Sequence, residues 1–349
     1  MGQRLRSVKW LRQAGWVLGI ALLALAIVYA LRGYPIPSGT QVRLVVYAFS
    51  TQEEGLTQRL FPAFERAWEA ETGQDLTIEG VFGASGTLAG QINLGAPADI
   101  AVFSNAEHVN WLKLGKRVRR DCEPMIIGCT PMIIVARQGN PLGIASYADL
   151  AQPGLNVLHA DPRSSGAGEW GVLAEYGSAF LSSGDRSAAQ RQLKAIWQNV
   201  WLLAPSARAA MTLFELGAGD ALVTYEQDAL RAQERGVKLE IVIPTRTVVA
   251  QHAAVVVDDN VTRAERPVAE AFVAYLLADA GQEILSESRM RPPNCRGSGF
   301  APLAEPFTAE DLGGWSAARL QLVERLWQSE IEPSLHLETY PETPGGGEP

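Results

Sequence analysis

The sequence has few of the residues that build metal centres or disulfide frameworks. It contains only 3 cysteines and 4 histidines among 349 residues, and neither an HExxH nor a CxxC spacing occurs. We therefore expect no metal site and no cofactor. The cysteines are Cys122, Cys129 and Cys295. Their spacing leaves two interpretations open, a bridge between Cys122 and Cys129 or free buried thiols.

Positive charge is also scarce beyond the N-terminus. The first 32 residues carry five basic residues and no acidic one, so the rest of the chain has 25 basic against 38 acidic residues. A body of this charge repels nucleic acid and anionic lipid. We expect no nucleic-acid partner, and any anion that binds must be small and held by local dipoles.

One long apolar run is present, and it lies near the N-terminus. Residues 1–13 are basic, and residues 14–31 (AGWVLGIALLALAIVYAL) carry no charge. As a helix this run is about 27 Å long, close to the thickness of a bilayer core. It is either a signal peptide or an anchor with a cytoplasmic N-terminus, and we favour the uncleaved anchor. Both place the chain after Arg32 outside the cytoplasmic membrane.

The remaining chain alternates predicted strands and helices. After a Pro/Gly-rich linker (32–41), strands are predicted at 42–49, 75–83 and 98–104, with helices at 54–73 and 87–95 between them. A similar series follows, and this pattern indicates α/β units with mostly parallel sheets. We predict two lobes crossed twice by the chain, followed by a polar tail. The boundaries are 42–134 for the first part of lobe 1, 135–244 for lobe 2, 245–332 for the return to lobe 1 and the C-terminal helices, and 333–349 for a disordered tail.

Loops of small residues follow several predicted strands. Each precedes a predicted helix or an apolar stretch, and the first turn of a helix exposes unpaired N–H groups with a partial positive charge. Small residues allow an anion to reach those groups. The loops are 47–53 (YAFSTQE), 82–88 (FGASGTL), 163–170 (RSSGAGEW) and 205–213 (PSARAAMTL).

Each loop also has a simpler interpretation. Ser85 or Ser165, taken alone, is more often a helix N-cap than a ligand contact. A nucleophilic serine is disfavoured because neither GASGT nor SSGAG matches G-x-S-x-G, and the sequence places no base beside them. The P-loop pattern is absent as well. The recurrence of small-residue helix starts favours anion binding over these alternatives.

The loops and several further stretches resemble the sulfate- and thiosulfate-binding proteins of ABC importers. The matching stretches run in order from about residue 42 to about residue 320. They include LFPAFERAWEAETG, FGASGTLAGQI, DPRSSGAGEW, SARAAMTLFELGAGDALVTYEQDAL and AEAFVAYLLADAGQEIL. The resemblance implies a type II periplasmic-binding fold, in which two α/β lobes with mixed sheets close over a tetrahedral anion.

The resemblance also implies how the anion is held. Neutral groups would bind it: backbone N–H groups at helix starts, a serine hydroxyl and a ring donor. Tyr225 stands where the family has a tryptophan, and Ser50 and Thr51 stand where it usually has an acidic residue. These departures leave sulfate favoured, with thiosulfate, molybdate and phosphate open. The implied ligand-binding residues are Ser50, Thr51, Ser85, Ser165, Gly166, Ala167, Ala207 and Tyr225.

The sequence therefore predicts a monomeric solute-binding component of an ABC importer, without catalysis. Its partners would be a small oxyanion, permease subunits and the membrane at its N-terminal helix. An anion-sensing or adaptor domain is the alternative, and a serine esterase using Ser165 is a lesser one.

Overall fold

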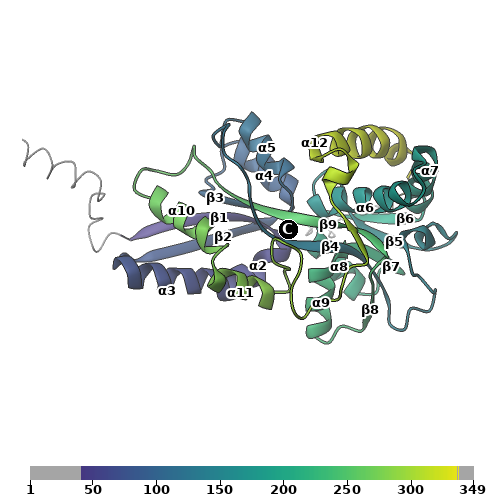
Figure 1. Ribbon diagram of the computed structural model, residues 1–349, viewed down its shortest axis with the longest axis horizontal. Helices are drawn as coiled ribbons and strands as arrows, with labels where there is room; N and C mark the ends of the chain where they lie inside the picture. The colour runs from purple at the N-terminus through teal and green to yellow at the C-terminus, as the bar shows by residue number, and fades with distance from the viewer. Residues whose placement is uncertain (1–40, 336, 338–349) are drawn as a thin grey trace, which may run out of the picture.

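The computed structural model describes residues 41–335 and 337, in which ten strands form a continuous, curled sheet with helices on its faces (Figure 1). The strand order is β2-β1-β3-β9-β4-β7-β5-β6, with β8 paired to β4 and β10 paired to β9. The strands are β1 Val42–Phe49, β2 Leu76–Gly83, β3 Ile100–Phe103, β4 Met125–Arg137, β5 Val157–Ala160, β6 Val200–Ala204, β7 Ala221–Tyr225, β8 Leu239–Val242, β9 Arg246–Val256 and β10 Glu305–Phe307. The predicted mixed α/β class is confirmed.

Two groups of parallel strands divide the sheet into a first half (β1, β2, β3) and a second half (β5, β6, β7). In the first half, helices α4 and α5 cover one face and α3 and α11 cover the other (Figure 1). In the second half, α6 and α7 lie on one face and α8 and α9 on the other. The helices are α2 Glu53–Gly55, α3 Phe61–Thr72, α4 Ser85–Asn93, α5 Glu107–Leu114, α6 Gly166–Ser183, α7 Arg186–Trp197, α8 Ala207–Glu215, α9 Glu226–Glu234, α10 Arg266–Tyr275, α11 Asp279–Glu287 and α12 Trp315–Ala318.

The long strands β4 and β9 join the two halves. They pair antiparallel with each other, and β9 pairs with β3 of the first half while β4 pairs with β7 of the second. Near the crossing, Gly128 lies so close to Met290 that an added Cβ would be 2.2 Å from its Sδ. Strand β9 thus passes from one half to the other, as β4 does.

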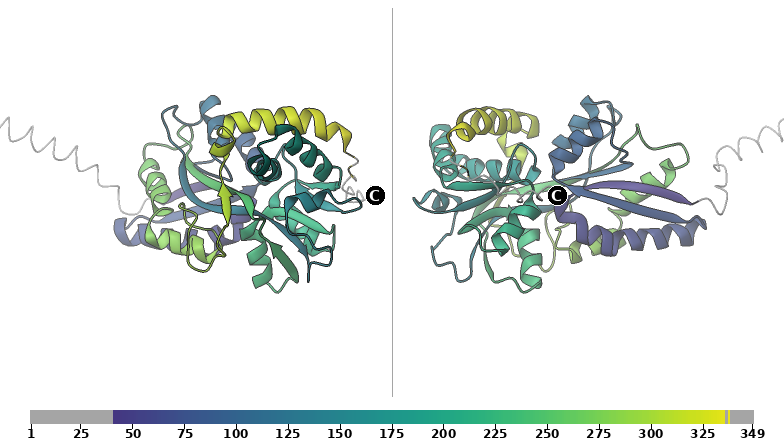
Figure 2. Two further views of the ribbon diagram at one scale, coloured as in Figure 1. Left: turned by 45° about the vertical axis from the view of Figure 1, so that its right-hand side comes forward. Right: turned by 180° about the vertical axis from the view of Figure 1, so that it is seen from behind.

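Short helical segments and a C-terminal helix complete the fold. The short segments are η1 Ser50–Gln52, η2 Leu56–Leu60, η3 Tyr147–Ala151, η4 Ala309–Leu312 and η6 Glu332–Ser334. Helix α12 continues into η5 (Arg319–Ile331), and together they form the C-terminal helix, which lies over α6 and α7 (Figure 2). The rings of Trp197 and Trp327 meet there at 5.1 Å, and both are fully buried.

Local sequence explains most element ends. Helix α3 ends at Gly73, whose φ of 69° is the left-handed conformation that glycine adopts readily. The stretch 266–285 forms two helices, α10 and α11, rather than one. Gly281 accounts for the break, because its missing Cβ lets α11 approach the end of α10, where a Cβ would be 2.0 Å from the Tyr275 carbonyl oxygen.

The cysteine pairing differs from both sequence-based interpretations. Cys129 of β4 forms a disulfide with Cys295, with a Cα–Cα distance of 5.6 Å, while Cys122 is free. The Cys122–Cys129 bridge, one of the two interpretations left open by the sequence, is therefore wrong. Reciprocal backbone hydrogen bonds between Cys129 and Arg291, of 2.9 and 3.0 Å, bring these distant segments together.

No helix within 41–335 is long and apolar enough to cross a membrane. The predicted anchor at 14–31, the basic segment before it and most of the predicted tail lie outside the described residues.

The disulfide predicts a large and specific effect on stability. Because it closes a chain separation of 166 residues, its loss frees a long loop in the unfolded state. Cys295→Ser should lower the free energy of unfolding by about 3–5 kcal/mol. Urea denaturation of the oxidised protein measures this change. The matched control, Cys122→Ser, should change stability by less than about 1 kcal/mol, and equal effects of the two variants would contradict the assignment.

Candidate ligand-binding site

A small cavity lies where the carboxyl ends of six strands meet. Strands β1, β2 and β3 of the first half and β5, β6 and β7 of the second half end around it, and each is followed closely by a helix or helical turn. The empty space among its lining atoms, counted together with the open solvent at its mouth, is about 170 Å³. In open α/β sheets ligands bind at this edge, so the cavity is the candidate site. It is lined by Phe49, Ser50, Gly83, Ala84, Ser85, Ser104, Ser165, Gly166, Ala167, Ala207 and Tyr225.

The structure brings seven of the eight predicted site residues to this cavity. Thr51 is the exception, because its side chain turns away and its Oγ1 donates to Asp228 Oδ2 at 3.2 Å. The Thr51 carbonyl accepts a hydrogen bond from Arg231 at 3.1 Å. Thr51 thus connects the two halves beside the cavity. The pKa of Asp228 is raised to about 6, mainly because the carboxylate is buried.

The start of α6 supplies one wall. Ser165 occupies the N-cap position, yet its hydroxyl makes no capping hydrogen bond, and its own N–H donates to the Asp161 carbonyl at 2.8 Å. Gly166 and Ala167 are the first two helical residues, so their N–H groups have no acceptor within the helix. This wall therefore offers N–H donors and a hydroxyl that helix capping does not use.

Close packing across the halves requires glycine at position 166. A Cβ built on Gly166 would lie 1.8 Å from Ser104 Oγ and 3.1 Å from Asn105 Nδ2. Ser104 follows β3 in the first half, whereas Gly166 begins α6 in the second. The missing side chain lets the Ser104 hydroxyl lie against the start of α6.

The start of α4 supplies a second wall, and its donors are already partly used. The N–H groups of Gly86 and Thr87 donate to the Ser164 carbonyl of the second half, at 3.0 and 3.3 Å. Ser85 Oγ accepts from the Ser104 N–H at 3.1 Å and lies 2.9 Å from His108 Nδ1. Ser85 therefore fixes the site through its hydroxyl, and its backbone N–H remains the group predicted to face a ligand.

The start of α8 supplies a third wall at Ala207. Ser206 caps this helix, since its hydroxyl accepts from the Ala209 N–H at 3.2 Å. Ala207 lines the cavity. As the first residue of α8, it has a backbone N–H group without an acceptor within the helix. Arg208 lines a separate hollow on α8 and α9 rather than this cavity.

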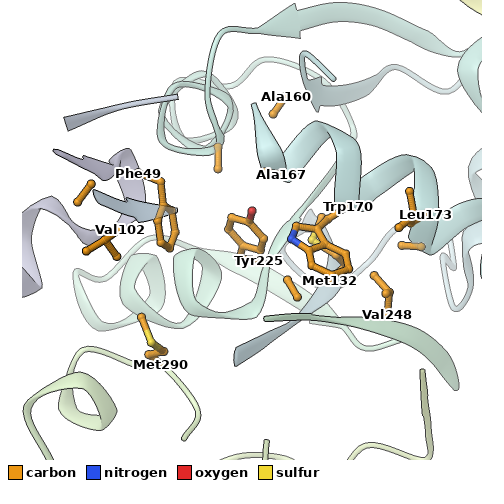
Figure 3. Packing of buried hydrophobic residues seen from close by; sticks show 14 of the residues in the cluster. Phe49, Val102, Met132, Ala160, Ala167, Trp170, Leu173, Tyr225, Val248 and Met290 are labelled. Atoms are coloured by element: carbon orange, nitrogen blue, oxygen red, sulfur yellow. The ribbon is translucent and has the colours of Figure 1, made fainter. Parts of the chain in front are cut away.

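Tyr225 ends β7 at the cavity, and its whole side chain is buried. Its ring packs edge-on against Phe49, with centroids 6.2 Å apart, and against His252, with centroids 5.4 Å apart. Figure 3 shows the phenol oxygen directed toward the side of Ala160 and Ala167. Burial raises the pKa of Tyr225 well above its usual value, against the effect of the nearby Ser104 hydroxyl. The phenol therefore keeps its proton at neutral pH.

Ser104 is the functional candidate that the sequence interpretation missed. It lines the cavity, it is 1% exposed, and its hydroxyl has no hydrogen-bond partner. The signal was present, because Ser104 closes the strand predicted at 98–104 and so falls at a strand end. The sequence interpretation did not include Ser104 because no glycine-rich loop follows it, whereas such loops contain Ser85 and Ser165.

The cavity lining is electrically neutral, because none of its eleven residues carries a charged side chain. The buried acid Glu169 is held by Asn105 Nδ2 at 2.8 Å and Arg319 Nε at 3.0 Å. His108 Nε2 faces the same carboxylate at 3.4 Å. Burial is the main cause that lowers the pKa of His108 to about 3, and the positive charge of Arg319 adds to it. Burial raises the pKa of Glu169. These groups join the halves outside the cavity.

Known proteins match this chain over most of its length. The family model "Bacterial extracellular solute-binding protein" matches residues 55–291. The chain belongs to this family. The sulfate-binding protein of Salmonella typhimurium is 33% identical over 278 residues, covering 74% of this chain and 83% of that protein. The thiosulfate-binding protein of Pseudomonas aeruginosa is 31% identical, covering 67% and 73%.

A solved structure agrees with the sequence matches. The sulfate-binding protein SubI from Mycobacterium tuberculosis superposes on this solute-binding protein with a TM-score of 0.74 at 27% identity, covering 80% of this chain and 99% of that one. The predicted resemblance to the sulfate- and thiosulfate-binding proteins is confirmed. The ligand contacts of the individual residues stay predictions.

The packing of Gly166 against Ser104 yields a test of the cavity wall. Gly166→Ala should lower the free energy of unfolding by about 1–3 kcal/mol, because the new methyl group displaces the Ser104 hydroxyl. Urea denaturation measures the change. Gly90→Ala in α4 is the matched control, since a Cβ there meets nothing within 4 Å. It should be neutral or stabilising, and equal losses in both variants would contradict the packing.

His252 predicts a pH dependence of stability. Burial lowers its pKa from 6.5 to about 4. Below pH 6.5 the unfolded chain takes up a proton that the folded protein does not, so stability falls as the pH is lowered from 6.5 to about 4. His252→Asn removes this titration while an amide N–H replaces the Nδ1 donor.

Between pH 6.5 and about 4, the His252→Asn variant should therefore lose less stability than the wild type. The difference between the two slopes should be at most about 1.4 kcal/mol per pH unit. Urea denaturation of both proteins at several pH values measures the difference, and the shared titration of His108 cancels. Parallel curves for the two proteins would show that His252 is not the titrating group.

Proposed function

We propose that this chain is the extracytoplasmic solute-binding component of an ABC importer and that it binds a tetrahedral oxyanion, with sulfate as the first candidate. The observation that carries the proposal is the cavity itself. Its walls are helix starts from both halves, and none of its lining side chains is charged. The names of the sulfate- and thiosulfate-binding relatives agree with this chemistry.

Neutral donors can hold a dianion in such a cavity. An ion that enters it loses several kcal/mol of hydration or more. Charge-assisted hydrogen bonds of about 1.5–3 kcal/mol each offset this loss. Six or seven of them are enough for micromolar binding, about −8 kcal/mol. We assign N–H donors to Ser85, Gly166, Ala167 and Ala207, and hydroxyl donors to Ser165 and Tyr225.

The first loop contributes at Ser50 rather than Thr51. Ser50 lines the cavity, whereas the Thr51 hydroxyl is bonded to Asp228. Ser50 therefore stays in the proposed ligand set, and Thr51 supports the site by joining the halves.

We propose that the halves are lobes that close over the anion about β4 and β9. The first lobe would comprise 42–134 and the return after 245, and the second lobe 135–244. Contacts around the cavity support a closed state: Gln52 bonds Gln227 at 3.0 Å, and Trp170 Nε1 donates to the Ser104 carbonyl at 2.9 Å. We further propose that 14–31 anchors the protein in the membrane beside its permease.

Binding without turnover is the activity that the site supports. Ser85, His108 and Glu169 are in contact in series, which resembles the order of groups in a serine hydrolase. However, a histidine whose pKa is lowered to about 3 is a poor general base at neutral pH. We therefore assign this series a structural role and no catalytic one.

A ligand panel tests the proposal directly. Titration calorimetry at fixed ionic strength should show binding of sulfate, and no comparable heat with chloride. Thiosulfate and molybdate define the selectivity. If no oxyanion binds, the proposed function is wrong.

Removing one hydroxyl tests the assigned site. Ser165→Ala should weaken sulfate binding by about 1–3 kcal/mol, because one donor to the anion is lost. The control is Ser182→Ala, whose hydroxyl bonds the Ser178 carbonyl at the exposed C-terminal end of α6. Its affinity should match that of the wild type. An unchanged affinity in Ser165→Ala would remove Ser165 from the ligand set.

A further inference from the structure

Two buried hydroxyls at the cavity have no hydrogen-bond partner. Ser104 Oγ and Tyr225 Oη both lack one, although each residue is only 1% exposed and both line the cavity. Buried polar groups without a partner are rare, and each destabilises the folded protein. Because these two hydroxyls lie at the same cavity, we expect them to contact a ligand.

The rest of Ser104 is fully committed to the protein. Its N–H donates to Ser85 Oγ, and its carbonyl accepts from Trp170 Nε1 at 2.9 Å and from His252 Nδ1 at 3.1 Å. Gly166 leaves space for the hydroxyl, as shown by the 1.8 Å distance that a Cβ there would have from Ser104 Oγ. The backbone is therefore fixed by both halves, and only the hydroxyl is free to serve the cavity.

The Ser85 hydroxyl also lies at the cavity, but it differs from those of Ser104 and Tyr225 because it has hydrogen-bond partners within the protein. It accepts the Ser104 N–H and lies 2.9 Å from His108 Nδ1. His108 Nε2 faces Glu169, so we assign the histidine proton to Nε2. Nδ1 then accepts a hydrogen bond from the Ser85 hydroxyl. That hydroxyl proton is used within the protein.

The chemistry of the free pair differs from that of the N–H donors around it. A backbone N–H can only donate, whereas a serine or tyrosine hydroxyl both donates and accepts. Both hydroxyls belong to residues that line the same cavity. A hydroxyl that accepts a hydrogen bond from an O–H group of a ligand keeps its own proton, and it can donate that proton in a hydrogen bond to another oxygen of the same ligand.

We propose that Ser104 and Tyr225 form an acceptor-capable pair that admits a tetrahedral dianion carrying one proton, of the hydrogen phosphate type, in addition to fully ionised sulfate. This inference rests on the proposed oxyanion site and defines its ligand class. Ser104 is thereby a binding residue, and the pair determines whether a protonated oxyanion is accepted.

Calorimetry at about pH 8, where inorganic phosphate is mainly a dianion with one proton, tests the pair. The wild type should bind inorganic phosphate within about tenfold of its sulfate affinity. The double variant Ser104→Ala/Tyr225→Phe should weaken phosphate binding at least about tenfold more than sulfate binding. Ser165→Ala, outside the pair, should weaken both ligands to a similar degree, and thermal unfolding of each variant confirms that it is folded.

The outcomes separate the two proposals. A wild type that binds sulfate but binds phosphate more than about a hundredfold more weakly overturns the pair and leaves the proposed function intact. Equal weakening of both ligands in the double variant also overturns it. If neither ligand binds the wild type, the proposed function itself is wrong. Should the double variant unfold, Ser104→Ala alone must give the selective loss of phosphate binding, or the inference fails.

Discussion

The proposed function places one electrostatic constraint on the structure: a cavity without charged side chains would have to hold an ion. The dipoles at helix starts can meet this requirement only if several of them meet at one point. Six strand ends achieve this, three from each half of the curled sheet. Because the walls come from both halves, the proposed binding would couple an anion to the contact between the halves. In that proposal the long strands β4 and β9, which join the halves, let the contact open and close without breaking the sheet.

Supporting groups keep charge away from the cavity while fixing its walls. Glu169 is buried next to it, but Asn105 and Arg319 hold this carboxylate behind the wall. Ser104 receives two ring N–H groups on its carbonyl, one from the second half and one from β9. Gly166 lets these parts approach each other. The neutral lining is thus maintained by a charged and aromatic layer outside it.

Much of this arrangement could be predicted from the sequence, and the remainder could not for definite reasons. Small residues after apolar strands indicated Ser85, Ser165, Gly166 and Ala207, because the rule that places ligands at strand ends needs only local pattern. Thr51 and Ser50 are adjacent, and the sequence cannot show which one turns inward. The Cys129–Cys295 disulfide joins segments 166 residues apart, so it depends on tertiary contacts that no local pattern records. Ser104 was missed because its loop lacks the glycines that marked the others.

A crystal structure of the protein grown with selenate, a heavier analogue of sulfate located by anomalous scattering, tests the central claim most directly. The account predicts one selenium site inside the cavity. Its oxygens should lie about 2.7–3.1 Å from the N–H groups of Gly166, Ala167 and Ala207, with no cation or basic side chain in contact. An anion held instead in the hollow beside Arg208, or a cavity anion paired with a cation, would contradict it.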